Sequence, residues 1–159
     1  MEYVFSTQIG NLKIKTEEGE IVSLSLVSEK ISDFKSSEKL VQSAIKELDE
    51  YFKGKRKTFS LPLNPKGTPF QKRVWEELRK IPYGKTVSYQ DIALRLGNKN
   101  LTRAVGGANN KNPIIILIPC HRVIGKNGTL TGFACGVDIK EKLLKLEKGY
   151  SLSFGRGLG

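Results

Sequence analysis

The chain of 159 residues is 38% hydrophobic, which suffices for one ordinary domain or two small ones and excludes a chain without a core. It contains no run of eighteen apolar residues and no secretion leader, so we expect a cytoplasmic protein and exclude membrane-spanning and secreted classes. Two cysteines and one histidine are too few for a disulfide framework or an easily assembled four-ligand zinc site, and the net charge of +11 favours a polyanionic partner.

Residues 1–60 are predicted to form a small α+β domain. Apolar and polar positions alternate over 2–9, 12–16 and 20–27, which is the pattern of three antiparallel strands joined by tight turns. Over 38–53 the apolar residues recur at helical spacing, so we expect one helix that covers the sheet.

The next segment, 54–67, has no usable period and contains Pro62 and Pro65, which indicates a linker. Helical signals begin again at Thr68. We therefore divide the chain into an N-terminal domain, a linker, a C-terminal domain and a loose tail. These units span residues 1–60, 61–67, 68–150 and 151–159.

Three helices are expected at the start of the C-terminal domain. The first begins at Thr68, where Gln71 can complete a capping box, and the second begins at Ser88 by the same logic and ends at Gly97. A third follows over 101–109 and completes the length of a helix-turn-helix.

Two adjacent glycines, Gly106 and Gly107, interrupt this third helix. In a helix interior they cost about 2 kcal/mol relative to alanines, so we expect a reason for them. Close approach of a ligand and a tight helix–helix contact would each be a sufficient reason, and the sequence leaves both open.

The run Ile114–Ile118 is apolar and largely β-branched. We expect a buried extended segment that carries Pro119, Cys120 and His121 at its end. A last helix, capped by Asp138, is predicted to close the domain with its apolar face.

Positive charge is concentrated after residue 60. Residues 1–60 hold ten basic and ten acidic side chains, whereas the rest of the chain holds 17 and six. Such a surface attracts a polyanion through phosphate contacts, but the lysine-rich solvated surface of a heat-adapted protein gives the same totals. Charge alone leaves both interpretations open.

Cys120 is followed directly by the only histidine, His121. The imidazole could deprotonate the thiol, directly or through a water, and Glu147 on the closing helix could hold the far ring nitrogen. The alternative is a small buried cysteine beside a hydrogen-bonded core histidine, and adjacency alone favours that alternative.

A longer string of residues changes this balance. Asn112-Pro113, the apolar run, the sequence IPCHRV at 118–123 and Gly136 resemble the signature of the O6-alkylguanine-DNA alkyltransferase family. The similarity covers residues 69–149, while residues 1–60 match the family only in architecture. The resemblance implies a two-domain α+β fold: a ribonuclease H-like sheet and helix, then a mostly helical, winged-helix-like domain with the helix-turn-helix.

The resemblance also implies the activity. Cys120 would take an alkyl group from O6 of guanine in double-stranded DNA, once and irreversibly, because a thioether offers water no reactive centre. This chemistry needs no cofactor or metal, although composition alone leaves a zinc site open. We expect a monomer that accepts one alkyl group per chain, and a lower melting temperature once that group is forced into a packed pocket.

By resemblance, the helix-turn-helix enters the minor groove of DNA. Ala104, Gly106 and Gly107 would lie on the DNA, and Arg103 would fill the place of a flipped nucleotide. Taken alone, Arg103 is more typical of a phosphate clamp or a solvated charge.

Tyr89 and Asn112 also fall on functional positions of the family. Tyr89 would supply a proton to the guanine ring as the alkyl group leaves, but a tyrosine in a first helical turn more commonly packs on the core. Asn112 would bond backbone near the active-site turn, and an Asn-Pro turn initiator is the alternative. Both roles of Asn112 can hold together.

The alkyl pocket is expected, again by resemblance, to be lined by Pro119, Val123, Phe133, Ala134 and Cys135, with the Ala134 N–H aimed at O6. The sequence departs here from the family pattern. Tyrosine is common in place of Phe133, serine in place of Ala134, and glycine or arginine in place of Cys135. These departures leave the preferred alkyl group open.

Two other functions fit part of the pattern. A cysteine hydrolase also uses Cys, His and a carboxylate, but the sequence offers no recognisable oxyanion loop, and acyl transfer needs no basic helix-turn-helix. A DNA-binding protein of the same fold that senses lesions without transferring a group would not need Cys120. Transfer of a labelled alkyl group to Cys120 distinguishes the three.

Overall fold

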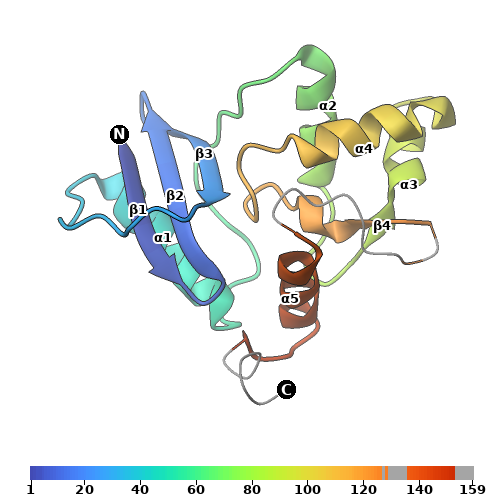
Figure 1. The fold of residues 1–159 in the computed structure, drawn as a ribbon. Coiled ribbons are helices and arrows are strands. Elements are labelled where there is room, and N and C mark those ends of the chain that lie inside the picture. Colours follow the sequence, from blue (N-terminus) through green and yellow to red (C-terminus); the bar gives the residue numbers. More distant parts are fainter. Residues whose placement is uncertain (127, 129–135, 153–159) are drawn as a thin grey trace.

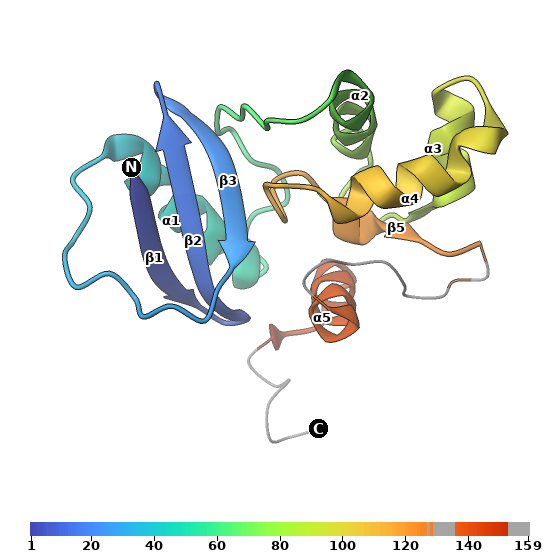
Figure 2. The ribbon, with the colours of Figure 1, turned by 45° about the horizontal axis from the view of Figure 1, so that its top comes forward.

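The computed structural model describes residues 1–126, 128 and 136–152, which form two parts (Figure 1). The N-terminal part consists of strands β1 (Glu2–Thr7), β2 (Gly10–Glu17) and β3 (Glu20–Leu26) and helix α1 (Lys39–Phe52). The strands form an antiparallel sheet in the order β1-β2-β3, and α1 packs on one of its faces (Figures 1 and 2). This confirms the small antiparallel sheet and covering helix predicted from the sequence.

Alternation of apolar and polar residues produces this sheet. In β2 the side chains of Leu12 and Ile14 are fully buried, whereas Lys13 between them is not. Helix α1 buries Val41 and Leu48 against the same core. Each fully buried aliphatic side chain of this kind stabilises the fold by about 1.5–3 kcal/mol.

The C-terminal part is mostly helical. Its helices are α2 (Pro69–Leu78), α3 (Tyr89–Arg95), α4 (Thr102–Asn110) and α5 (Val137–Glu147), with one-turn 3₁₀ helices η1 (Lys99–Leu101) and η2 (Cys120–Arg122). Two short strands, β4 (Val87–Ser88) and β5 (Val123–Ile124), form a parallel pair. None of the helices in the described residues combines the length and hydropathy needed to cross a bilayer.

Local capping signals determine where the first two of these helices begin. Thr68 accepts a hydrogen bond from the Gln71 N–H while the Gln71 side chain bonds back, and Ser88 and Asp91 repeat the arrangement. Both predicted capping boxes are thus confirmed. Helix α4 then packs across α2, where the Trp75 indole N–H donates to the Ala108 carbonyl at 2.9 Å.

Two local predictions were wrong. The run Ile114–Ile118 is buried as expected, but it folds back on itself, and the Ile118 N–H bonds the Ile114 carbonyl at 3.0 Å. Asp138 does not cap α5, because the N-cap residue is Gly136 without a side-chain bond and Asp138 lies in the first turn. There its negative charge still favours the positive end of the helix dipole.

The two parts meet along strand β3. The segment 54–67 contains no named helix or strand, but the Ile21 N–H bonds the Pro62 carbonyl and the Asn64 N–H bonds the Ile21 carbonyl. Farther along β3, Leu24 bonds the chain at Pro113 and Ile115. Figure 2 shows the loop before η2 beside β3, so the N-terminal sheet directly contacts the segment that precedes Cys120.

Candidate active site

The turn that precedes Cys120 is held from two sides. From inside, the Asn112 side chain donates to the Ile118 carbonyl at 2.8 Å and accepts from the Ile114 N–H at 3.0 Å. From outside, the Leu24 N–H donates to the Pro113 carbonyl at 2.9 Å, and the Leu24 carbonyl accepts from Ile115 at 3.0 Å. Asn112 therefore bonds the backbone of the active-site turn, in addition to preceding a proline.

Strain is stored in the same turn. Ile116 has a φ of 71°, which is unusual for a β-branched residue, and the Leu117 N–H bonds the Ile115 carbonyl across it. Such a conformation costs on the order of 1–3 kcal/mol and persists only where the surroundings enforce it. The contacts of Asn112 and Leu24 supply that enforcement.

Cys120 and His121 lie in η2, and both are buried, with exposed fractions of 2% and 0%. The His121 Nε2 atom is 2.7 Å from Glu147 Oε2, so the expected contact between the carboxylate and the far ring nitrogen is present. Burial alone would raise the pKa of Glu147, but His121 and Arg122 outweigh it and hold that pKa well below its usual range. Glu147 is therefore a carboxylate, and His121 Nε2–H is the donor.

This arrangement assigns the tautomer of His121. With the proton on Nε2, the Nδ1 atom carries a lone pair, and it has no hydrogen-bond partner within the described part of the chain. Burial lowers the pKa of His121, although Glu147 acts in the opposite direction, so the ring is neutral at neutral pH. A buried, neutral imidazole adjacent to Cys120 is suited to accept a thiol proton.

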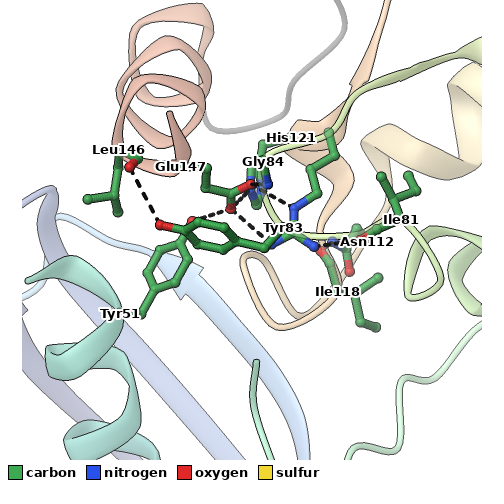
Figure 3. A network of polar contacts seen from close by, with 10 residues as sticks. Tyr51, Ile81, Tyr83, Gly84, Asn112, Ile118, His121, Leu146 and Glu147 are labelled. Carbon is green, nitrogen blue, oxygen red and sulfur yellow. Dashed lines mark hydrogen bonds and ion pairs between the residues drawn. The ribbon is translucent and has the colours of Figure 1, made fainter. Parts of the chain in front are cut away.

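Glu147 is the centre of a larger network (Figure 3). Arg122 donates from Nε to Oε1 at 2.8 Å and from Nη2 to Oε2 at 3.0 Å. The Tyr51 hydroxyl donates to Oε2 at 2.6 Å, and the Gly84 N–H donates to Oε1 at 3.2 Å. Within the described ranges, the carboxylate therefore accepts hydrogen bonds from four residues, counting His121.

No role was predicted from the sequence for Arg122 or Tyr51. Arg122 lies within the family signature directly after His121, and this position could have suggested a role near the active site. Tyr51 is separated from Glu147 by 96 residues. A helical aromatic at the end of an apolar face looks like an ordinary core residue, and no local signal identifies its polar partner.

Lys140 is a third residue for which the sequence did not indicate a role. It is fully buried on α5, and its ammonium donates to the Val123 carbonyl at 2.5 Å. Burial lowers the pKa of Lys140 to about 8, with the charge of Cys120 acting against the decrease. The ammonium also lies 5.8 Å from the centre of the Tyr89 ring. Its position in the sequence could have predicted its burial, because Lys140, Leu143 and Glu147 are spaced so that they share one buried face of the helix.

The residues predicted to contact DNA occupy the outer side of the helix-turn-helix. Arg103, Ala104 and Gly107 are exposed on α4, and Gly106 is half-buried. A Cβ atom added at Gly107 would meet no heavy atom within 4 Å among the described residues, and one at Gly106 would meet only Tyr89 at 3.9 Å. Tight packing against the described residues is therefore not the reason for the glycine pair.

The elements that carry this surface also contact the segment around Cys120. Tyr89 is the first residue of α3, directly after Ser88, which pairs with Ile124 in the short parallel sheet. From α4, the Asn109 amide donates to the Cys120 carbonyl at 3.4 Å. Helix α4 thus contacts η2 directly, and the N-cap residue of α3 pairs with the strand that follows η2.

The predicted alkyl pocket is only partly visible. Pro119 and Val123 are buried on either side of η2. Phe133, Ala134 and Cys135 lie outside the described residues. As for metal ions, the described ranges contain no group of three or more His, Cys, Asp or Glu side chains that could bind one.

Comparison with known proteins gives two family matches. The model for the 6-O-methylguanine DNA methyltransferase DNA-binding domain matches residues 69–149, and the model for the ribonuclease-like domain of the same family matches residues 2–65. The second match corrects the expectation that residues 1–60 are similar in architecture alone.

Similar proteins include several methylated-DNA–protein-cysteine methyltransferases. A methylated-DNA–protein-cysteine methyltransferase of Methanosarcina acetivorans is 56% identical over 111 residues, which cover 70% of this chain and 71% of that protein. The constitutive enzyme of the same name from Bacillus subtilis is 47% identical over 151 residues, covering 89% and 92%.

Solved structures agree with this match. The O6-methylguanine methyltransferase of Mycobacterium tuberculosis is 38% identical with a TM-score of 0.83, and the alignment covers 92% of each chain. A structure of the Mycobacterium tuberculosis protein in complex with DNA is also 38% identical, with a TM-score of 0.84 and 94% of each chain covered.

Proposed function

The chain belongs to the 6-O-methylguanine DNA methyltransferase family, and on that premise we propose that it repairs DNA by moving an alkyl group from O6 of guanine to Cys120. One observation carries the proposal. Buried Cys120 precedes His121, whose Nε2 is fixed by ionised Glu147 at 2.7 Å and whose Nδ1 is left as the proton acceptor. The relatives named as methylated-DNA–protein-cysteine methyltransferases support the same activity.

The reaction begins with the thiol proton. His121 accepts it at Nδ1, and Glu147 stabilises the imidazolium that forms. The thiolate then attacks the alkyl carbon, a sulfur–carbon bond forms, and the carbon–O6 bond breaks with its electron pair passing to the guanine. Tyr89 donates a proton to the guanine ring and becomes a phenolate, and the proton held by His121 then reprotonates Tyr89 through solvent. The net exchange is a thiol proton for an alkyl group.

Lys140 supports the thiolate electrostatically. A cation in a buried site acts on neighbouring charges through a low effective dielectric, where its influence is larger than in water. The fully buried ammonium is held in place by the Val123 carbonyl and lies near both Tyr89 and Cys120. It thus favours negative charge on the sulfur before transfer and on the phenol oxygen after proton donation.

The partner is double-stranded DNA that carries an O6-alkylguanine. The exposed face of α4 offers Arg103, Ala104 and Gly107, and the absence of a packing reason for the glycine pair, among the described residues, supports close approach of DNA there. The guanine must leave the base stack, at a cost of a few kcal/mol, to bring O6 to a buried sulfur. Arg103 fills the vacated space. The protein acts as a monomer and is consumed, because nothing cleaves the thioether.

A labelled substrate tests this function. DNA containing radiolabelled O6-methylguanine is incubated with the protein, and peptide mapping locates the label. We expect one equivalent on Cys120, none in Cys120→Ala despite retained DNA binding, and slower transfer in Arg103→Ala than in Arg79→Ala, which removes an exposed arginine at the end of α2. Label that never leaves the DNA would indicate a lesion sensor, and turnover on esters would indicate a hydrolase.

A further inference from the structure

A tyrosine hydroxyl of the N-terminal domain reaches the proposed acid–base network. Tyr51 lies on α1, is fully buried, and donates to Glu147 Oε2 at 2.6 Å (Figure 3). We propose that Tyr51 is a positioning residue for alkyl transfer: through its hydrogen bond to Glu147 it controls how strongly that carboxylate acts on His121. The inference rests on the proposed function, and it gives the N-terminal domain a part in the chemistry.

The hydrogen bonds that Glu147 accepts have two different effects: some fix the orientation of the carboxylate, and others change how much negative charge it presents to His121. Arg122 holds both oxygens in a two-pronged contact at 2.8 and 3.0 Å, and this contact alone fixes the plane of the group. Glu147 Oε2 then receives two further donors, the His121 Nε2–H at 2.7 Å and the Tyr51 hydroxyl at 2.6 Å. Because Arg122 already provides placement, the main effect of Tyr51 is to compete with His121 for the electron density of one oxygen.

Tyr51 keeps its proton across the useful pH range. Burial is the largest cause of its raised pKa, and the charge of Glu147 adds to the increase. The phenol is therefore a constant neutral donor. Its ring is fixed by aromatic neighbours, with Phe59 at 5.4 Å and Tyr83 at 6.2 Å between ring centres.

The consequence for His121 has a definite sign. His121 is faced by Glu147 and Lys140 from α5 and by Arg122 from its own turn, while Tyr51 and Tyr83 act on it through Glu147. Without the Tyr51 hydroxyl, Glu147 would concentrate more charge on the His121 N–H and make Nδ1 more basic. Cys120 would then lose its proton at a lower pH.

The test compares Tyr51→Phe with Tyr3→Phe in the full-length protein. Tyr3 is a matched control, because its hydroxyl also donates a hydrogen bond, but to the Phe34 backbone carbonyl at 2.7 Å within the N-terminal domain, and not to a residue of the network. His121 is the only histidine, so its ring nitrogens give one unambiguous set of NMR signals. Iodoacetamide alkylation, followed at the Cys120 peptide by mass spectrometry, reports thiolate formation against pH.

In Tyr51→Phe we expect the His121 Nε2–H resonance to move downfield. We also expect the pH at which alkylation of Cys120 reaches half its maximal rate to decrease by roughly half a pH unit. Below that pH, iodoacetamide should react about threefold faster than in the unsubstituted protein. Tyr3→Phe should match the unsubstituted protein in both measurements. DNA affinity should stay unchanged in both variants, because neither tyrosine lies on the helix-turn-helix.

A second variant covers the case in which Tyr51→Phe does not fold. Incorporation of 3,5-difluorotyrosine at position 51 keeps the shape but makes the hydroxyl a stronger donor, so both shifts should reverse. If His121 and Cys120 titrate as in the unsubstituted protein in every folded Tyr51 variant, Tyr51 only braces the domain interface and the inference is wrong. Failure of the unsubstituted protein to take label from O6-methylguanine would instead refute the proposed function.

Discussion

The helix-turn-helix and the active-site turn, residues 112–122, lie side by side but are stabilised in different ways. Helix α3 begins at a capping box made by Ser88 and Asp91, and Asn98 caps the turn that follows, so contacts within a few residues fix these elements. The active-site turn holds a strained Ile116 and depends on Leu24 and Glu147, far away in the sequence. The proposed DNA-contacting residues are therefore replaceable without loss of the fold, whereas the proposed chemical residues also support it.

Among the substitutions considered, Glu147→Gln should have the largest effect, because Glu147 supports both the fold and the proposed chemistry. The substitution removes the charge opposite Arg122, which is only 6% exposed, and an unpaired buried guanidinium costs about 3–5 kcal/mol. Urea unfolding should show this loss of stability, and alkyl transfer should be abolished while binding to undamaged DNA remains.

Glu141→Gln is the matched control on the same helix. Glu141 forms an exposed ion pair with Lys145 at 2.9 Å, and such a pair contributes less than about 1 kcal/mol. If Glu147→Gln were as stable as this control, the active-site turn would not depend on the network, and the contrast between the two regions would fail.

The pH dependence of transfer tests Lys140 with an intermediate effect. The pKa of Lys140 is lowered to about 8, so its positive charge is present below that pH and is lost as the pH rises through it. Because the charge stabilises the Cys120 thiolate, the transfer rate should fall on the alkaline side of pH 8. In Lys140→Met this fall should disappear, and the rate at neutral pH should be about tenfold lower.

Lys145→Met serves as the control for a lysine on the same helix, since Lys145 is exposed and paired with Glu141. It should retain the alkaline fall. If the transfer rate of Lys140→Met still fell above pH 8, the fall would come from the titration of another group, and Lys140 would have no part in the proposed mechanism.

The same contrast explains what the sequence could predict. The starts of α2 and α3 were predictable because Thr68 and Ser88 act on residues three positions away. The pairing of His121 with Glu147 was suggested by the chemistry of the residue types. By contrast, the fold-back of Ile114–Ile118 depends on Leu24 and Asn112, and a run of apolar residues with strand propensity gives no indication of it.

Charged and polar side chains in the core were the hardest to predict. Tyr51, Arg122 and Lys140 each belong to a type that is usually explained by packing or by solvent exposure. Their partners are fixed by tertiary structure: the Arg122 guanidinium reaches the Ile81 carbonyl as well as Glu147, and Lys140 reaches the Val123 carbonyl. Only the assembled fold identifies the buried network as one unit.

Gly107→Ala should show the smallest effect, and it separates stability from DNA binding. The site is exposed and a Cβ there meets no heavy atom within 4 Å in the described part of the chain, so alanine should stabilise α4 by up to about 1 kcal/mol. Affinity for DNA should nevertheless decrease, because the added methyl group occupies the space into which we expect the DNA backbone to come. Thermal unfolding and a DNA titration at fixed salt measure the two quantities.

Ser43→Ala, an exposed change on α1, controls for helix propensity and should leave DNA affinity unchanged. If Gly107→Ala were more stable and bound DNA as tightly as the unsubstituted protein, DNA would not approach this face closely. Neither packing against the described residues nor DNA binding would then explain the glycine pair.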